Sequence, residues 1–233
     1  MEVISAEVTR TTLRSTWESE AADWIAWARS PELDDDFWQF HLPHFLNLLP
    51  PPGKLTIDIG CGEGRLGRIL TKSGYRVIGF DTALPFVRAA AAHPEGHPVA
   101  VADAARLPVR DGLADLVVAF MCLHDFDDLP GAVREAARIL TPGGRLCIAL
   151  LHPLVTSKLA GAYDVEQRYE QTVAKPGHRM TYHGVHRPLA TYATALESAG
   201  LVIESLREPV KTTTERDTVP FLHLRCVRET RPR

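Results

Sequence analysis

The sequence has no apolar run long enough to cross a membrane, since its longest uninterrupted hydrophobic stretches have the length of strands. Its N-terminal residues lack the apolar core of a secretory signal. Cysteine is scarce and scattered, with no C-x-x-C pair; the four cysteines are Cys61, Cys122, Cys147 and Cys226, and three of them lie in apolar, strand-like contexts. These absences predict a cytoplasmic globular protein with reduced thiols in its core and no membrane partner.

An excess of basic residues is also absent: 26 Lys and Arg against 29 Asp and Glu give a net charge of -3 at pH 7. Because nucleic-acid binding needs a basic surface, we expect no such partner. Two histidine pairs, His41-x-x-His44 and His183-x-x-His186, have no third ligand at a recognisable spacing, so no metal site is predicted. With 233 residues and no internal repeat, the chain fits one domain with or without a lid.

Apolar residues at helical spacing mark the N-terminal part of the chain. They cover residues 15–30 and a second segment over 37–49, and the prolines at 50–52 end this region because they cannot continue a helix. We therefore predict an N-terminal helical lid region over residues 1–49 and a main domain over 50–228. Either an aromatic lid over a pocket or ordinary helix packing would explain the four tryptophans of this region, which are Trp17, Trp24, Trp27 and Trp38.

From residue 55 onward, short apolar runs alternate with helical patterns. The strand-like runs cover residues 55–59, 75–80, 98–102, 115–121 and 145–151, and the helical patterns cover 65–73, 83–92 and 129–140. Such alternation implies right-handed crossovers. We therefore predict an α/β, Rossmann-like doubly wound fold with a mostly parallel sheet and helices on both faces.

The alternation stops after residue 151. Residues 152–187 show no clear period, and we interpret about 152–188 as an insertion, because a loop of this length in a compact domain is usually functional or mobile. A helical pattern over 189–199 and strand-like runs over 201–206 and 219–227 follow. The last two runs have no helix between them, so they should pair antiparallel.

The first strand-to-helix turn reads Asp58-Ile59-Gly60-Cys61-Gly62-Glu63-Gly64. Its glycines let the backbone approach a ligand, and the following helix presents free N–H groups. The turn also fits the dinucleotide fingerprint G-x-G-x-x-G, but Asp58 and Glu63 would repel a pyrophosphate and would suit a ligand with sulfonium and ammonium groups. Asp81 and Asp103 end the second and third strands, where they can bind ribose hydroxyls and an adenine amine.

The segments TIDIGCGEG, VIGFD, VAVADAARLPV, DLVVAFMCLHDFDDL and EAARILTPGGRLCIALLHP follow one another in an order that resembles the class I S-adenosylmethionine-dependent methyltransferases, of the ubiquinone-biosynthesis-like, type 11 group. The resemblance covers residues 50–228 and implies a seven-stranded sheet with an antiparallel last strand. It also implies S-adenosylmethionine as cofactor and S-adenosylhomocysteine as product. Together with the analysis of the turn, it predicts the cofactor-binding residues Asp58, Gly60, Cys61, Gly62, Gly64, Asp81, Asp103, Ala104 and Met121.

Methyl transfer from a sulfonium is an in-line displacement, so the acceptor must chiefly be positioned, and an oxygen acceptor usually also needs a base. Candidates for this base follow the fourth and fifth strands or lie in the insertion, on the acceptor side; each is as readily a hydrogen-bonded structural residue. The predicted catalytic residues are His124, His152 and His186, with Asp125, Tyr182, His183 and Arg187 as further candidates. Five Lys and Arg against three acids between His152 and Pro188 hint at an acidic or polar acceptor.

The predicted function is methyl transfer to oxygen or nitrogen of a small-molecule acceptor in biosynthetic or secondary metabolism, by a monomer or homodimer. An NAD(P)-dependent oxidoreductase is the first alternative, disfavoured by the acids at the turn and by the ending in two successive strands. A non-catalytic cofactor-binding subunit is the second, and the intact glycines and Asp81 argue against it. A protein acceptor stays open.

Overall fold

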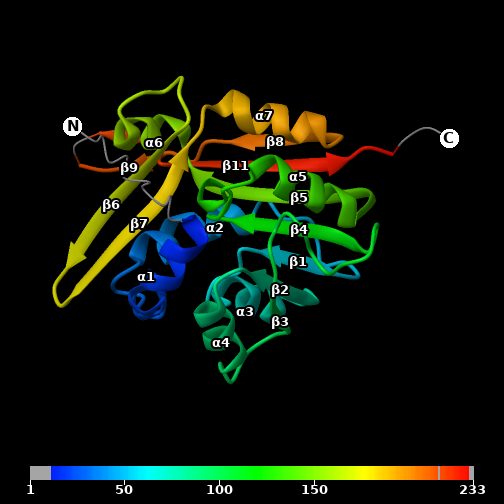
Figure 1. The fold of residues 1–233 in the computed structure, drawn as a ribbon, viewed down its shortest axis with the longest axis horizontal. Helices are drawn as coiled ribbons and strands as arrows, with labels where there is room; N and C mark the ends of the chain where they lie inside the picture. Colours follow the sequence, from blue (N-terminus) through cyan, green and yellow to red (C-terminus); the bar gives the residue numbers. More distant parts are fainter. Residues whose placement is uncertain (1–11, 215, 231–233) are drawn as a thin grey trace, which may run out of the picture.

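A seven-stranded sheet forms the centre of the computed structural model, which describes residues 12–214 and 216–230 (Figure 1). The strand order is β3-β2-β1-β4-β5-β11-β8. β11 pairs antiparallel with β5 and β8, and the other neighbours pair parallel, which confirms the predicted mostly parallel sheet with an antiparallel last strand. The strands are β1 (Thr56–Ile59), β2 (Val77–Asp81), β3 (Val99–Val101), β4 (Ala114–Phe120), β5 (Leu140–Leu151), β8 (Leu201–Arg207) and β11 (Phe221–Arg228).

Apolar side chains cover both faces of this sheet, as the continuous apolar run of the fourth strand predicts for a strand buried on both sides. On β4, Val117 and Ala119 belong to one buried cluster together with residues of α5 (Leu129–Ile139) and α7 (Leu189–Ser198). Val118 and Phe120 belong to a second cluster on the other face, with residues of α3 (Arg65–Lys72). The remaining helix that packs on this sheet, α4 (Leu84–Ala91), contacts β2 and β3.

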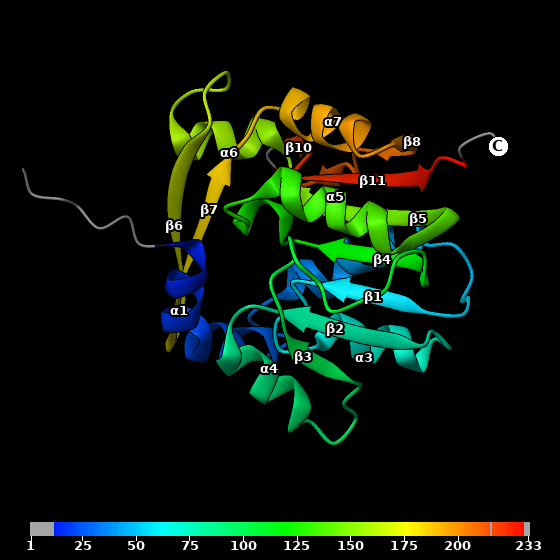
Figure 2. The same cartoon turned by 45° about the vertical axis from the view of Figure 1, so that its right-hand side comes forward.

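The N-terminal region is helical within the described residues, and its residues 1–11 lie outside them. It contains α1 (Leu13–Ala28), a π-helical segment η1 (Phe37–His41) and α2 (Leu42–Leu46). Thr12 begins α1 because its hydroxyl accepts a hydrogen bond from the backbone N–H of Ser15. In Figure 2, the parallel strands β1, β2 and β4 point their carboxyl ends toward α1, which therefore stands at the edge where ligands bind in open α/β sheets.

The predicted insertion has regular structure, so the interpretation of this segment as a long loop was wrong. After α6 (Pro153–Ala160), β6 (Gln167–Lys175) and β7 (His178–His186) pair as an antiparallel hairpin outside the main sheet. β7 packs against α1 (Figure 1). The sequence hides this hairpin because most of β6 is exposed on both sides, so apolar and polar residues do not alternate along it.

The remaining elements are short: η2 (Leu123–Asp125) follows β4, and β9 (Lys211–Thr212) pairs with β10 (Asp217–Thr218) between β8 and β11. All four cysteines are free and buried, as expected for core thiols. Across residues 12–214 and 216–230, the helices are too short or too polar for any of them to cross a bilayer.

Candidate cofactor and acceptor site

A cavity of about 570 Å³ opens at the carboxyl ends of β1, β2 and β4, within the size range of small-molecule sites. Its walls come from the glycine turn after β1, the segments after β2, β3 and β4, and parts of α1, η1, β7 and β11. Eight of the nine predicted cofactor-binding residues line it: Asp58, Gly60, Cys61, Gly62, Asp81, Asp103, Ala104 and Met121.

The glycines of the turn meet different steric requirements. All three have positive φ, the conformation that side chains disfavour. A Cβ on Gly60 would lie 2.5 Å from the Cβ of Cys122, so Gly60 lets the turns after β1 and β4 approach each other. At Gly62 the nearest atom to such a Cβ would be Nε1 of Trp24 at 3.7 Å, so this backbone borders the cavity and a ligand can approach it.

Gly64, the ninth predicted cofactor residue, caps α3 instead of lining the cavity. A Cβ there would lie 3.0 Å from the Cβ of Ala90 and 3.2 Å from the ring of His97. Its lack of a side chain therefore lets α3 and α4 pack closely. A contact of Gly64 with the cofactor stays a prediction.

Asp81 connects the end of β2 to the glycine turn. Its carboxylate accepts hydrogen bonds from the backbone N–H groups of Gly62, at 2.8 Å, and Ala83, at 2.9 Å. Burial raises the pKa of Asp81, and these hydrogen bonds oppose that rise by stabilising the ionised form. The carboxylate thus orders the turn while it lines the cavity.

Asp58 supplies the strongest indication of a cationic ligand. The residue is 1% exposed, and its Oδ2 atom is buried without a hydrogen-bond partner in the described structure. Burial, and secondarily the charge of Asp81, raise the pKa of Asp58 to about 8. A buried carboxyl without a partner is costly, and a cation brought by a ligand would relieve that cost. The ammonium and sulfonium groups of S-adenosylmethionine fit this requirement.

Glu63 borders the same cavity, but unlike Asp58 it already has charged partners within the protein. Its carboxylate is 1% exposed and forms ion pairs with Arg29, at 2.9 Å, and Arg68, at 2.7 Å. Arg29 ends α1, and its guanidinium also donates to the carbonyl oxygen of Ala89 in α4. Glu63 therefore anchors α1 to the glycine turn, which the sequence alone does not reveal.

Asp103, Ala104 and Met121 line the cavity at the ends of β3 and β4. Asp103 is exposed at the rim, where its carboxylate accepts a hydrogen bond from the N–H of Ala105, and Ala104 is buried. Met121 has a φ of 57°, and among the described residues no other non-glycine residue has a positive φ. Such strain is typical of a functional site, because the surrounding structure must hold it in place.

The three predicted catalytic histidines separate in the structure. His124 lies in η2, lines the cavity, and has its Nδ1 buried without a partner among the described residues. Burial, and secondarily the charge of Arg187, lower the pKa of His124 to about 3, so its imidazole is neutral. Its Nε2 lies 3.6 Å from Oδ1 of Asp125, a buried acid that also lines the cavity. A catalytic role for His124 stays a prediction that this placement favours.

His152 and His186 are engaged in structural hydrogen bonds. His152 caps α6 by accepting the N–H of Leu154, and its Nε2 lies 2.7 Å from Glu208. Both ring nitrogens of His186 have partners, namely the hydroxyl of Thr156 and the carbonyl oxygen of Tyr163. Neither histidine is among the described residues that line the cavity, so the structure does not bring them to His124.

Parts of α1, η1, β7 and β11 form the wall of the cavity on the lid side. The sequence analysis left the role of some of its residues open and assigned no role to others. Trp17 and Trp24 of α1 line the cavity, while Trp27 is buried against Leu33 and Met180, so the tryptophans serve both as lining and as packing. The wall also includes His41, His183 and Phe221. No local motif identifies His41 and Phe221, because their position depends on how distant segments pack.

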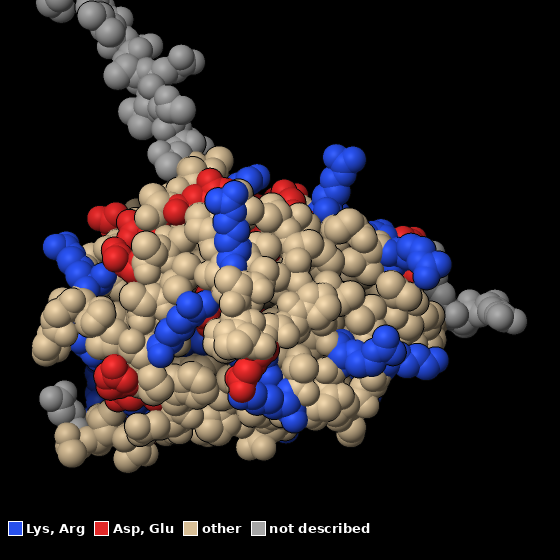
Figure 3. Space-filling view, turned by 90° about the horizontal axis from the view of Figure 1, so that it is seen from below, with Lys and Arg blue, Asp and Glu red and all other residues tan. Residues whose placement is uncertain are grey.

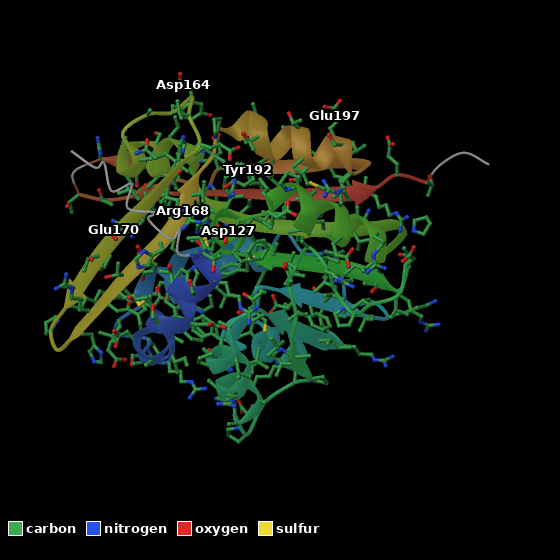
Figure 4. The ribbon with its side chains drawn as sticks, viewed as in Figure 1. Asp127, Asp164, Arg168, Glu170, Tyr192 and Glu197 are labelled. Carbon is green, nitrogen blue, oxygen red and sulfur yellow. The ribbon has the colours of Figure 1, made fainter. Side chains whose placement is uncertain are left out.

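Asp127 links the two segments that close the wall. Its Oδ2 accepts a hydrogen bond from the backbone N–H of Leu13 at the start of α1. Its Oδ1 lies 2.7 Å from the guanidinium of Arg168 on β6 (Figure 4). The helix and the hairpin are therefore both tied to the segment after η2.

Comparisons with known proteins identify the family of the domain that contains this site. Residues 57–148 match the family model described as a methyltransferase domain. The ubiquinone/menaquinone biosynthesis C-methyltransferase of Caulobacter vibrioides is 37% identical over 131 residues, which are 50% of this chain and 52% of that protein. A probable tRNA methyltransferase 9B of Bos taurus is 36% identical over 100 residues, 42% of this chain and 21% of that protein. This chain thus matches about half or less of each of these two relatives.

The solved structures show the same fold. An S-adenosylmethionine-dependent methyltransferase from Mesorhizobium loti aligns with a TM-score of 0.64 at 24% identity, covering 80% of this chain and 96% of that one. The fold and the glycine turn thus define the class I methyltransferase architecture. Through residues 57–148 the chain carries a methyltransferase domain of the S-adenosylmethionine-dependent family, and the cofactor that this domain implies is S-adenosylmethionine. The predicted family, fold and cofactor are confirmed.

Proposed function

We propose that the protein transfers the methyl group of S-adenosylmethionine to a small-molecule acceptor, on oxygen or nitrogen, in biosynthetic or secondary metabolism. The partnerless carboxyl of Asp58 beside the glycine turn carries this proposal, because it calls for a cation where the cofactor would bind. The cavity also continues past the turn to the wall of α1, η1 and β7, which leaves space for a second ligand.

Different residues of the site would bind the cofactor, exclude water and contact the acceptor. S-adenosylmethionine, when bound, supplies an electrophilic methyl group. Asp58 would hold its cationic end, Asp81 its ribose and Asp103 its adenine, so that the methyl group faces the acceptor wall. Trp17 and Trp24 exclude water from that wall, and a neutral His124 can accept a hydrogen bond or a proton from the acceptor.

The first experiment is calorimetry with S-adenosylmethionine, S-adenosylhomocysteine, NAD and NADP, each with wild-type protein and with Asp81→Ala. We expect micromolar binding of the first two ligands and its loss in the variant. Because Asp58 is largely protonated near pH 7 without ligand, binding a cation beside it should also release a proton, which calorimetry in buffers of different ionisation enthalpy measures. Binding of the nicotinamide nucleotides alone would support the oxidoreductase alternative.

Cofactor binding without turnover across an acceptor screen would support the non-catalytic alternative. The two relatives are a ubiquinone/menaquinone biosynthesis C-methyltransferase and a probable tRNA methyltransferase, so the screen should include carbon nucleophiles and a tRNA. Small molecules are the favoured acceptors. On the face that Figure 3 shows, Lys and Arg are interspersed with Asp and Glu, not gathered into a basic surface.

A further inference from the structure

Flat rings from several elements line the cavity outside the glycine turn. The imidazole of His41 stacks on Phe221, with 3.8 Å between ring centroids and 6° between planes, and lies 4.5 Å from the ring of Phe120. Trp24 and Tyr182 meet edge to face at 5.8 Å on the lid side. All five side chains line the cavity, so a ligand that enters it meets aromatic surfaces from several elements.

Two of the three imidazoles that line the cavity, His41 and His124, are uncharged. His41 is 3% exposed, and its Nε2 is buried with no hydrogen-bond partner among the described residues. Burial, and secondarily the charge of the neighbouring His223, lower the pKa of His41 well below its usual value. Like His124, it can form hydrogen bonds but cannot neutralise an anion, whereas the third imidazole that lines the cavity, His183, lies 4.0 Å from the carboxylates of Glu20 and Glu170.

The cations near the wall are already engaged. Two arginines line the cavity among the described residues, Arg14 and Arg65. Arg65 pairs with Asp34 at 2.5 Å and lies with its guanidinium 3.6 Å from the centroid of the Phe37 ring. Arg14 is mostly exposed at the rim and pairs with Glu18.

The basic residues of the insertion do not face the acceptor wall, although their excess in the sequence hinted at an acidic acceptor. Arg168 pairs with Asp127 and Lys175 pairs with Asp35, while Arg187 donates to the carbonyl oxygens of Leu123 and Phe126. None of these three residues is among the described residues that line the cavity.

Negative charge is already disfavoured inside the cavity. Burial raises the pKa of Asp125, the acid beside His124 in the cavity, well above its usual value, which means that the acceptor side destabilises even the carboxylate it contains. A carboxylate or phosphate on an acceptor would meet the same cost without a free cation. This argument concerns the acceptor wall and not the glycine turn, where backbone N–H groups can bind an anionic group.

We infer that the acceptor is a molecule with a flat aromatic part and no anionic group, and that the site rejects acceptors bearing a carboxylate or a phosphate. The inference rests on the proposed function, because it takes the wall of His41, Phe221, Trp24 and Tyr182 as the acceptor side of the cofactor site. The aromatic surfaces favour a planar ring, and the engaged cations and buried acids exclude an anion.

Three near-isosteric phenols test the inference on the full chain loaded with S-adenosylhomocysteine. They are 4-hydroxyphenylacetamide, tyramine and 4-hydroxyphenylacetate, which are neutral, cationic and anionic at pH 7. Their binding is followed by quenching of tryptophan fluorescence, since Trp17 and Trp24 line the cavity. We expect the amide and the amine to bind at least about tenfold more tightly than the carboxylate, a difference of about 1.4 kcal/mol.

A charge added to the wall should change this ranking. Gln171 of β6 lines the cavity, whereas the adjacent Thr172 is not among the described lining residues. Gln171→Arg should reduce the discrimination between amide and carboxylate by at least about threefold, because it supplies the missing cation. Thr172→Arg adds the same charge outside the cavity and should leave the discrimination unchanged.

The outcomes separate the two proposals. If S-adenosylhomocysteine itself does not bind, the proposed function fails. If it binds but the carboxylate binds as tightly as the amide, or none of the three phenols binds, the inference about the acceptor is overturned. Equal effects of Gln171→Arg and Thr172→Arg would also overturn it, because they would show a long-range effect of net charge.

Discussion

The two ends of the cavity are built in different ways. The cofactor end consists of turns that directly follow consecutive strands of one sheet, at Asp58–Gly64, Asp81 and Asp103. The acceptor end gathers side chains from α1, η1, the β6–β7 hairpin and β11, which are far apart in the sequence.

This difference has a physical origin. The carboxyl ends of parallel strands meet at one edge whatever the rest of the chain does, so short motifs there suffice to build a site. The acceptor wall exists only because Glu63 anchors α1, Asp127 joins α1 to the hairpin, and His41 stacks on Phe221. We therefore expect substitutions at the cofactor end to act on cofactor affinity and those at the acceptor end to act on turnover.

The largest effect should come from His124→Ala, which we expect to lower kcat about 100-fold while S-adenosylhomocysteine affinity stays within about threefold. His152→Ala is the matched control, because His152 bonds to Glu208 away from the cavity, and it should keep most of the turnover. Since the pKa of His124 is about 3, its protonation should not reduce turnover between pH 6 and 9. Equal losses of turnover in both variants would contradict the proposed contact of His124 with the acceptor.

The next effect concerns the cofactor end. Asp81→Ala should weaken S-adenosylhomocysteine binding about 100-fold, or about 2.7 kcal/mol, because it removes the proposed ribose acceptor and the two hydrogen bonds that order the turn. Asp103→Ala, at the exposed rim, should cost about tenfold or less. Calorimetry measures both, with thermal unfolding without ligand as the check on folding. The reverse order would show that the rim, not the turn, dominates cofactor binding.

A smaller effect separates close packing from backbone conformation. Gly60→Ala and Gly143→Ala both place a side chain at positive φ, which costs about 1–2 kcal/mol. Only Gly60 would also press a Cβ against Cys122, at 2.5 Å, whereas nothing lies within 4 Å at Gly143. Gly60→Ala should therefore lower the free energy of unfolding by about 1–3 kcal/mol more, as denaturant unfolding would show. Equal losses would mean that the turns after β1 and β4 can separate freely.

The smallest effect is a gain in stability without ligand. The folded pKa of Asp58, about 8, lies above its unfolded value, so the folded state binds the extra proton and loses stability as the pH rises toward 8. Asp58→Asn removes this loss, and its advantage in unfolding free energy should grow by about 1.4 kcal/mol between pH 7 and pH 9. The same variant should bind S-adenosylmethionine more weakly. A pH-independent difference in stability would contradict the buried, partnerless carboxyl.

Much of the fold could be predicted because its signals are local. Strand-like runs, helical spacing and the two final strands without a helix between them correspond to β1 to β5, α3 to α5, β8 and β11. The hairpin was missed because β6 is mostly exposed and carries no alternation. The partner of β7 outside the hairpin, α1, also lies far away in the sequence, and no residue pattern within 152–188 reveals this contact.

The candidate site likewise contains some residues that local motifs predict and others that they do not. Asp58, Gly62 and Asp81 could be assigned to the cavity from the motifs, since each lies at or just after the carboxyl end of a strand of the sheet. The partners of Glu63 could not be predicted, because nothing in the sequence shows that Arg29, in another element, reaches its carboxylate. His152 follows an expected strand end and His186 lies in the expected insertion, but a sequence position does not fix the direction in which a side chain points.

By itself, the sequence determined the parallel sheet, the glycine turn and the acids that end β1, β2 and β3, because period and turn chemistry act over a few residues. Only the tertiary structure decided which groups remain without a partner. Asp58 and Glu63 stand in the same turn and are equally buried, yet one has a partnerless carboxyl oxygen and the other is paired with two arginines. Such pairing depends on side chains brought together over long distances in the chain, and it sets the charge of the site and with it the ligand that fits.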